Sequence, residues 1–267
     1  MTIPPRILIV AGSDSGGGAG LQADLKTVLA LGGYGMTAVT ALTAQNTLGV
    51  HEVLAVPPAF VRRQMRVVLD DLGADAIKTG MLKDAGIIAA VAEELPSNVP
   101  LILDPVMIAK GGAALLDVQA IDALKQLLLP RTTVLTPNLP EAEALLGFAI
   151  ADLDGMRRAA ALLLALGPAA ILLKGGHLPG DIVHDVLIDA AGLQVFSAPR
   201  IVSRHTHGTG CTLASALATG LGAGLSLTEA TVRARDYVRE AIRTAPGFGH
   251  GHGPLGHGHT VGRFQET

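Results

Sequence analysis

The residues with the clearest chemical potential are 203–215, which read SRHTHGTGCTLAS. Small and polar residues give way there to the apolar run Leu213–Leu221, which predicts a helix. Gly208, Thr209 and Gly210 then fall on the turn and first residues of that helix, where free backbone N–H groups and the positive end of the dipole collect. This position suits an anion. Gly-Thr-Gly is also a common way to begin a helix, so both interpretations stay open.

Cys211, the only cysteine of the chain, lies in the first turn of the same predicted helix. A helix N-terminus lowers the pKa of a thiol, which predicts a reactive cysteine. A lone cysteine is also commonly a small, buried, apolar residue, and this stretch alone does not decide between the two. One cysteine does exclude an intramolecular disulfide framework.

A glycine-rich loop, residues 12–20, follows the apolar run Arg6–Ala11 and precedes a helical pattern over residues 21–31. A strand, such a loop and a helix in this order predict a ligand loop at the carboxyl edge of a sheet. The loop lacks the G-K-[ST] of a P-loop and the G-x-G-x-x-G of a dinucleotide site, which argues against a dinucleotide-dependent oxidoreductase. Asp14 stands where a G-x-S-x-G nucleophile elbow requires serine, so that motif is excluded too.

Polar side chains stand at other predicted strand ends and helix starts. Gln45 follows the predicted strand 35–44, where a carboxamide either reads the edge of a heterocycle with one donor and one acceptor or caps a turn. Asp24 falls at about the first turn of the helix after the glycine-rich loop. Glu141 falls in the first turn of a helix that Asn138 or the next residue caps. For both acids, a simple match to the helix dipole is the alternative to a role in a site.

The rest of the chain alternates between predicted strands and helices. A short apolar piece spans 50–56, and further strands are expected at 75–78, 100–103, 133–136, 170–174, 183–189 and 193–197, the last two antiparallel. Further helices are expected at 57–72, 84–95, 117–129, 154–166 and 228–244. This alternation predicts one open, mostly parallel α/β sheet with its active site along the carboxyl edge. The loop 106–112, with Lys110 and two glycines, is a candidate lid.

Composition limits the function classes. Of the 267 residues, 49% are hydrophobic and 16% charged, and the net charge is −3 with no basic run, so nothing indicates nucleic acid or an anionic membrane surface as a partner. The first residues lack the regions of a signal peptide, and the apolar stretch 159–173 is too short to span a bilayer, so we expect a soluble cytoplasmic protein. The C-terminal segment 246–267 holds histidines between glycines. Metal binding is an option there, but we expect a flexible or loosely docked tail because glycine does not preorganise ligands.

Six motifs occur in order along the chain. They are Gly12–Asp24 (GSDSGGGAGLQAD), Thr40–Thr47 (TALTAQNT), Lys78–Met81 (KTGM), Asp104–Met107 (DPVM), Pro137–Ala142 (PNLPEA) and His207–Thr212 (HGTGCT). Together they make the chain resemble the hydroxymethylpyrimidine/phosphomethylpyrimidine kinases of thiamine biosynthesis, in the ribokinase-like superfamily. The resemblance covers nearly the whole chain. It implies one domain over residues 1–267, built as a three-layer α/β sandwich with a mostly parallel central sheet, the use of ATP and Mg²⁺, and a homodimer formed through the strands around 35–56.

The resemblance also implies roles for single residues on the substrate side. Gln45 would hydrogen-bond the aminopyrimidine edge, and Asp24 would hold the amino or hydroxymethyl end. The implied pocket walls are Gly12, Ala19, Met81 and Val106.

On the other side, the residues that the resemblance implies at the nucleotide are Lys174, Thr206, Gly208, Thr209 and Gly210. Those implied at Mg²⁺ are Asp104 and the Asn-x-x-Glu pair Asn138 and Glu141, of which the glutamate holds the ion through water. Cys211 follows Gly-x-Gly, where the sugar kinases of the superfamily carry an aspartate base. We therefore predict that its thiol accepts the hydroxymethyl proton near neutral pH.

A pyridoxal kinase or dual kinase of the same fold is the nearest alternative. Some relatives that act on pyridoxal use a second cysteine in the lid; the lid here, 107–112, has none, and it carries Gly111 where serine is expected. A non-catalytic pyrimidine-binding protein is a further alternative. It is disfavoured because binding alone would not require Glu141, Lys174 and the stretch 208–211.

Overall fold

A computed structural model describes residues 3–107 and 115–262 of the chain. These residues form one nine-stranded sheet in the order β3-β2-β1-β4-β5-β6-β7-β8-β9. The strands are β1 (Arg6–Asp14), β2 (Tyr34–Asn46), β3 (Gly49–Ala55), β4 (Ala76–Thr79), β5 (Leu101–Leu103), β6 (Val134–Leu135), β7 (Ala170–Lys174), β8 (Ile182–Asp189) and β9 (Gly192–Pro199). Strands β2, β1, β4, β5, β6 and β7 run parallel to their neighbours, and the pairs β2–β3, β7–β8 and β8–β9 are antiparallel. The predicted mostly parallel α/β sheet is confirmed.

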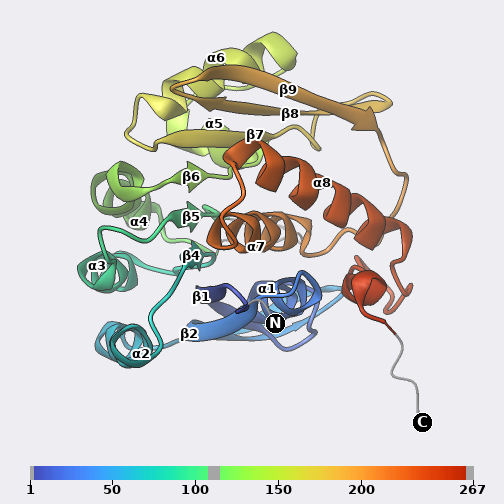
Figure 1. Cartoon of the computed structure of the whole chain (residues 1–267). Helices are drawn as coiled ribbons and strands as arrows, with labels where there is room; N and C mark the ends of the chain where they lie inside the picture. Colours follow the sequence, from blue (N-terminus) through green and yellow to red (C-terminus); the bar gives the residue numbers. More distant parts are fainter. Residues whose placement is uncertain (1–2, 108–114, 263–267) are drawn as a thin grey trace.

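Helices cover both faces of this sheet and complete three layers (Figure 1). One face carries α2 (Pro58–Asp71), α3 (Ala85–Glu94), α4 (Val118–Ala123), α5 (Leu139–Leu146) and α6 (Leu153–Leu164). The other carries α1 (Gly20–Ala30), α7 (Thr209–Gly222) and α8 (Leu227–Arg243). Leu8 and Val10 of β1 enter the first core, whereas Ile7 and Ile9 enter the second, which is why a doubly covered strand is apolar at every position. Within the described ranges, no helix has both the length and the apolar character needed to cross a membrane.

Side-chain N-caps begin α3, α5, α6 and α8. Asn138 caps α5: its Oδ1 accepts the Glu141 N–H at 2.9 Å, and Glu141 Oε2 accepts the Asn138 N–H at 2.8 Å. The helix predicted over 117–129 differs, because α4 ends at Ala123 and passes through a π-helical turn into a short 3-10 turn, Leu129–Arg131. The chain cannot continue as a regular helix there because Pro130 has no N–H to donate.

Residues 246–262 of the C-terminal segment do not form the flexible or loosely docked tail that we predicted. His257 is only 5% exposed; its Nε2 lies 3.0 Å from Thr212 Oγ1, and the Tyr237 hydroxyl donates to its carbonyl at 2.7 Å. The glycines permit close contact: a β-carbon at Gly251 would lie 2.0 Å from the carbonyl oxygen of Thr47. The glycine-rich composition of this segment predicted mobility, whereas in the fold its glycines allow close packing.

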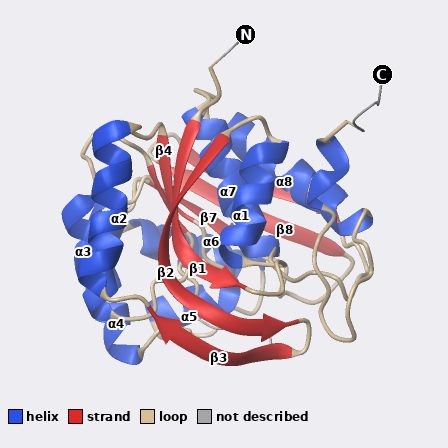
Figure 2. Cartoon of the chain, turned by 90° about the horizontal axis from the view of Figure 1, so that it is seen from below, coloured by secondary structure: helices blue, strands red, loops and turns tan. Residues whose placement is uncertain are grey.

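Strands β2 and β3 form a ribbon that curves away from the central strands (Figure 2). The pairing register shifts between Ala11 and Ser13 and again between Ala44 and Gln45, and such bulges bend a strand. The ribbon is clipped to the glycine-rich loop, because the Ser15 hydroxyl donates to the Gln45 carbonyl at 2.8 Å and accepts its N–H at 2.9 Å. The bend therefore holds Gln45 beside the loop that follows β1.

Candidate active site

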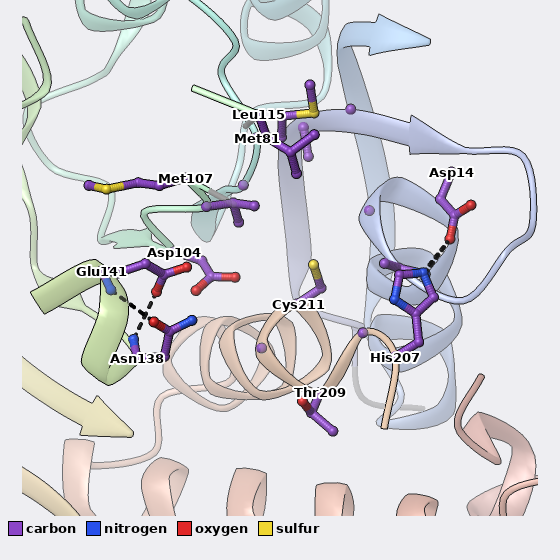
Figure 3. Close-up of a pocket in the computed structure, with 18 of the residues that line it drawn as sticks. Asp14, Met81, Asp104, Met107, Leu115, Asn138, Glu141, His207, Thr209 and Cys211 are labelled. Atoms are coloured by element: carbon purple, nitrogen blue, oxygen red, sulfur yellow. Dashed lines mark hydrogen bonds and ion pairs between the residues drawn. The ribbon is translucent and has the colours of Figure 1, made fainter. Parts of the chain in front are cut away.

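A cavity of about 490 Å³ opens where the carboxyl ends of β1, β2, β4, β5 and β7 meet the N-termini of α5 and α7 (Figure 3). Nearly every site residue implied by the sequence lines it: Gly12, Ala19, Gln45, Met81, Asp104, Val106, Asn138, Glu141, Lys174, Thr206, Gly208, Thr209, Gly210 and Cys211. Segments that are far apart in the chain meet here because parallel strands deliver their loops to one edge. Asp24 is the exception.

One end of the cavity is charged. Lys174, the last residue of β7, places Nζ 2.9 Å from Asp104 Oδ1 at the end of β5. Burial works against the lysine's charge, but Asp104 and Glu141 outweigh it and raise the pKa of Lys174. Burial and the nearby Asp104 carboxylate raise the pKa of Glu141 to about 7, against the pull of Lys174. Lys174 therefore stays positively charged beside Asp104 and Glu141, and Glu141 titrates near neutral pH.

This charged end fits Mg²⁺ with partial protein coordination. In the described part of the chain, no group of three or more histidines, cysteines or acids gathers tightly enough to hold a metal ion. Asp104 and Glu141 are nevertheless both buried oxygen donors that line the cavity. Two carboxylates plus water and phosphate oxygens are the ligand set that Mg²⁺ prefers.

Helix α7 begins at the floor of the cavity. Gly208 is its cap in the left-handed region, with φ of 84°, and a β-carbon there would lie 1.9 Å from the Gly18 carbonyl oxygen. The amides of Thr209 and Gly210 belong to the first turn, where the Thr209 N–H makes only a long hydrogen bond of 3.4 Å to the Thr206 carbonyl. A β-carbon at Gly210 would lie 3.1 Å from Lys174 Nζ, so this end of the helix adjoins the cation. The predicted helix start is confirmed, and its position suits a phosphoryl group.

The predicted low pKa of Cys211 is wrong for this ligand-free site. Its side chain points into the cavity between the charged end and Asp14 (Figure 3). Burial raises the pKa of Cys211 to about 12; the Lys78 ammonium lowers it, but the carboxylates Asp24 and Asp104 act against that cation. Desolvation of the thiolate therefore outweighs the helix N-terminus, which was the only influence visible in the sequence.

The sequence predicted that Asp24 would contact the ligand, but Asp24 does not line the cavity. It lies in the second turn of α1, fully buried, with its oxygens 2.8 and 2.9 Å from Lys78 Nζ and 2.7 Å from the Ser215 hydroxyl. Asp24 raises the pKa of Lys78 against the effect of burial, so the lysine stays charged, and Lys78 rather than Asp24 lines the cavity. Asp24 therefore forms a buried ion pair with Lys78 beneath the cavity and does not contact a ligand directly.

The other end of the cavity is apolar with a few polar groups. Met81 and Val106 line it beside Gln45, and Leu115 belongs to the same apolar cluster as Met81. Such a lining suits a flat heterocycle that is read by a small number of hydrogen bonds.

The family follows from comparison with known proteins. Residues 14–256 match the family described as phosphomethylpyrimidine kinase. The chain belongs to this family. It is 51% identical over 260 residues to a hydroxymethylpyrimidine/phosphomethylpyrimidine kinase of Streptomyces coelicolor, covering 97% of this chain and 96% of that protein. It is also 54% identical to the thiamine biosynthesis bifunctional protein ThiED of Geobacter sulfurreducens over 94% of this chain, but spans only 52% of that longer protein.

Solved structures show the same kinase fold. A phosphomethylpyrimidine kinase from Clostridium difficile superposes with a TM-score of 0.78 at 40% identity, covering 90% of this chain and all 100% of that one. A pyridoxal kinase from Staphylococcus aureus in complex with pyridoxal superposes with a TM-score of 0.89 at 34% identity, covering 96% and 94%. Fold alone therefore does not separate the two substrate classes.

Three residues of this phosphomethylpyrimidine kinase family member lie within the six motifs but were given no role from the sequence. Lys78 carried a signal, since a lysine within an apolar strand needs a buried counter-charge. The sequence gives no signal for the contact between Asp14 and His207, because the two residues lie 193 positions apart. Lys110 and Gly111 of the predicted lid lie outside the described residues.

Proposed function

We propose that this chain phosphorylates 4-amino-5-hydroxymethyl-2-methylpyrimidine and then its monophosphate, with ATP as the donor. One observation carries the proposal: a single cavity has apolar walls and a carboxamide at one end, and a lysine, two carboxylates and a helix N-terminus at the other. Cys211 lies between the two ends, where the acceptor hydroxyl would meet the phosphoryl group (Figure 3). The names of the similar kinases support the same two substrates.

In the proposed reaction the protein contributes position and charge. Phosphoryl transfer passes through a loose transition state whose charge must be stabilised more than its bonds must be assisted. The first-turn amides of α7 would hold the transferred group, and Lys174 would neutralise it. Mg²⁺, when held beside Glu141 and Asp104, supplies further positive charge to the phosphates. Asn138 keeps the Glu141 carboxylate in place through the two hydrogen bonds of the helix cap.

Cys211 is our candidate for the acceptor of the hydroxymethyl proton. Only its thiolate can take that proton, and a pKa of about 12 makes the thiolate a minor form in the ligand-free site. A base of this kind gives a kcat that rises with pH well above neutrality, and the rise disappears in Cys211→Ala. If Cys211→Ala keeps kcat within a few-fold and the same pH profile, while Gln45→Ala abolishes pyrimidine binding, Cys211 is not the base.

An ADP-release assay with three acceptors in parallel tests the function. The acceptors are the hydroxymethylpyrimidine, its monophosphate and pyridoxal. We expect turnover on the first two; turnover on pyridoxal alone, or on none, would refute the assignment.

Pyridoxal phosphorylation is the second candidate function. The S. aureus pyridoxal kinase, at a TM-score of 0.89, is the observation that favours it. The absence of a lid cysteine from residues 107–112 weighs against it. A kcat/KM for pyridoxal within about tenfold of that for the pyrimidine would establish a dual kinase.

A homodimer through the β2–β3 ribbon completes the proposal. Leu42 and Leu54 pair across the two strands and are 48% and 64% exposed, so the ribbon presents an apolar face. Light scattering of the native protein and of a Leu42→Glu/Leu54→Glu variant tests it, since the charges would split the dimer. The cytoplasmic location stays a prediction.

A further inference from the structure

Three side chains meet at the heterocycle end of the cavity. His207 Nε2 lies 3.1 Å from Asp14 Oδ2 and 2.8 Å from Gln45 Nε2 (Figure 3 marks the first contact). Asp14 ends β1, Gln45 lies near the end of β2, and His207 directly precedes the cap of α7. Both His207 and Asp14 are largely buried, with side chains 13% and 4% exposed. The hydrogen-bond roles in this cluster are therefore set by the protein rather than by water.

Asp14 acts only as an acceptor. Its carboxylate accepts the N–H groups of Gly16, Gly18 and Ala19 at 2.8 to 2.9 Å. Burial works against its ionisation, but hydrogen bonds from His207 and from these amides outweigh it and lower the pKa of Asp14. An ionised oxygen 3.1 Å from His207 Nε2 requires that this nitrogen carry a proton.

The imidazole is also fixed in position. A β-carbon at Gly18 would lie 2.5 Å from His207 Cδ2, so the ring packs directly on the glycine-rich loop. The backbone N–H of His207 donates to the Gly253 carbonyl at 3.2 Å, which ties the residue to the C-terminal segment. Ring position and protonation together leave Nε2 as an immobile donor beside Gln45.

This donor decides which way the Gln45 carboxamide points. Two N–H groups facing each other at 2.8 Å repel, whereas a half-turn of the carboxamide puts its oxygen against His207 and its nitrogen against Thr43 Oγ1. Thr43 can accept that N–H because its own hydrogen goes to the Ser13 carbonyl at 2.9 Å. In the rotated carboxamide the oxygen shares the single Nε2 hydrogen with Asp14 Oδ2 in a three-centre hydrogen bond, and no two N–H groups face each other, so the order of acceptor and donor along its edge is fixed.

We propose that Asp14 and His207 form a positioning pair that holds the Gln45 oxygen toward His207 and thereby selects a 4-aminopyrimidine over its 4-oxo analogue. The proposal rests on the proposed function, in which Gln45 reads the pyrimidine. The two heterocycles present opposite orders of donor and acceptor: amino group and bare ring nitrogen in one, carbonyl and ring N–H in the other. A carboxamide locked in one orientation matches only one of them, and leaves buried polar groups unpaired against the other.

The test compares His207→Phe, which keeps a flat ring without the donor, with His207→Gln, which returns an amide N–H near the Nε2 position. The kcat/KM ratio between the aminopyrimidine and its 4-oxo analogue is measured for each, with His250→Phe on the exposed tail as a matched control. In His207→Phe we expect the ratio to fall about tenfold and KM for the aminopyrimidine to rise about threefold to tenfold, since one charge-assisted hydrogen bond is lost. The KM for ATP should stay within about twofold. His207→Gln should restore most of the selectivity.

Several results would overturn the positioning role. An unchanged ratio in His207→Phe, an equal loss in His207→Gln, or a rise in the KM for ATP instead of the pyrimidine each does so. If wild-type protein fails to phosphorylate the aminopyrimidine, the proposed function falls instead, which separates the two failures. Nitrogen NMR of the ligand-free wild-type protein gives a measurement without mutation: His207 protonated at Nε2 supports the pair, and a bare Nε2 refutes it.

Discussion

The raised pKa of Cys211 gives a prediction that can be measured without substrate. As the only cysteine, Cys211 accounts for all thiol alkylation of the protein. At about pH 7.5, a thiol of pKa about 12 is ionised to roughly 3 parts in 10⁵, whereas an ordinary thiol of pKa about 8.5 is ionised to roughly one part in ten. The thiolate population is therefore lower by about 3,000-fold in the folded protein.

Nucleophilicity recovers part of that deficit. A more basic thiolate reacts faster, with a Brønsted coefficient of about 0.4–0.5, which returns roughly 30-fold over this difference in pKa. We therefore expect iodoacetamide to alkylate Cys211 about a hundredfold more slowly in the folded protein than in the same protein unfolded in guanidinium. The alkylation rate of the folded protein should still be rising about tenfold per pH unit at about pH 10. The alkylation rate of the unfolded protein should level off at about pH 9.

The pH profile separates the electrostatic cause from simple shielding. Restricted access slows alkylation equally at every pH and leaves the levelling point unchanged. A folded protein whose rate levels off at or below about pH 9 would show that the helix N-terminus and Lys78 outweigh burial in setting the pKa of Cys211.

Three other perturbations follow from buried titratable groups. Asp24→Asn leaves the buried Lys78 ammonium unpaired and should cost about 3–5 kcal/mol of unfolding free energy in urea titrations; adding Lys78→Met should return a large part of it. Because the pKa of Glu141 is raised to about 7, Mg²⁺ must displace a proton below that pH. Calorimetric affinity for Mg²⁺–ADP should then rise with pH up to about 7 and level off, and Glu141→Gln should remove this dependence. Burial lowers the pKa of His257 to about 4, so its contribution to stability is complete above about pH 6.5 and is lost as pH falls toward 4. Between pH 7 and about 4.5 the wild-type protein should lose about 2–3 kcal/mol more than His257→Gln.

Each of these has a clear opposing result. Full stability of Asp24→Asn would mean that Lys78 is not held charged by its partner. A flat Mg²⁺ affinity in wild-type protein would remove Glu141 from the metal side of the cavity. Equal acid sensitivity of wild type and His257→Gln would show that the docked segment tolerates a charged imidazole.

Sequence alone determined the features that depend on neighbours within one turn or one strand. The predicted strand 170–174 has the bounds of β7, and the start of α7 at Gly208–Thr209 lies where small residues give way to an apolar run. The cap of α5 was predicted to be one of two residues because Pro140 suits the first turn of a helix, and the structure selects Asn138. Doubly covered strands are apolar throughout, so the parallel sheet could be predicted as well.

Tertiary structure decided what depends on packing between distant segments. Asp24 falls in a turn where the sequence permits either a ligand contact or an ion pair, and only the position of Lys78, 54 residues away, selects the pair. The pKa of Cys211 depends on desolvation by surrounding elements, which no local pattern encodes. His207 meets Asp14 across 193 residues because the ends of β1 and the start of α7 share one edge of the sheet. Local chemistry thus gave the parts and the family, while long-range packing set their charges and partners.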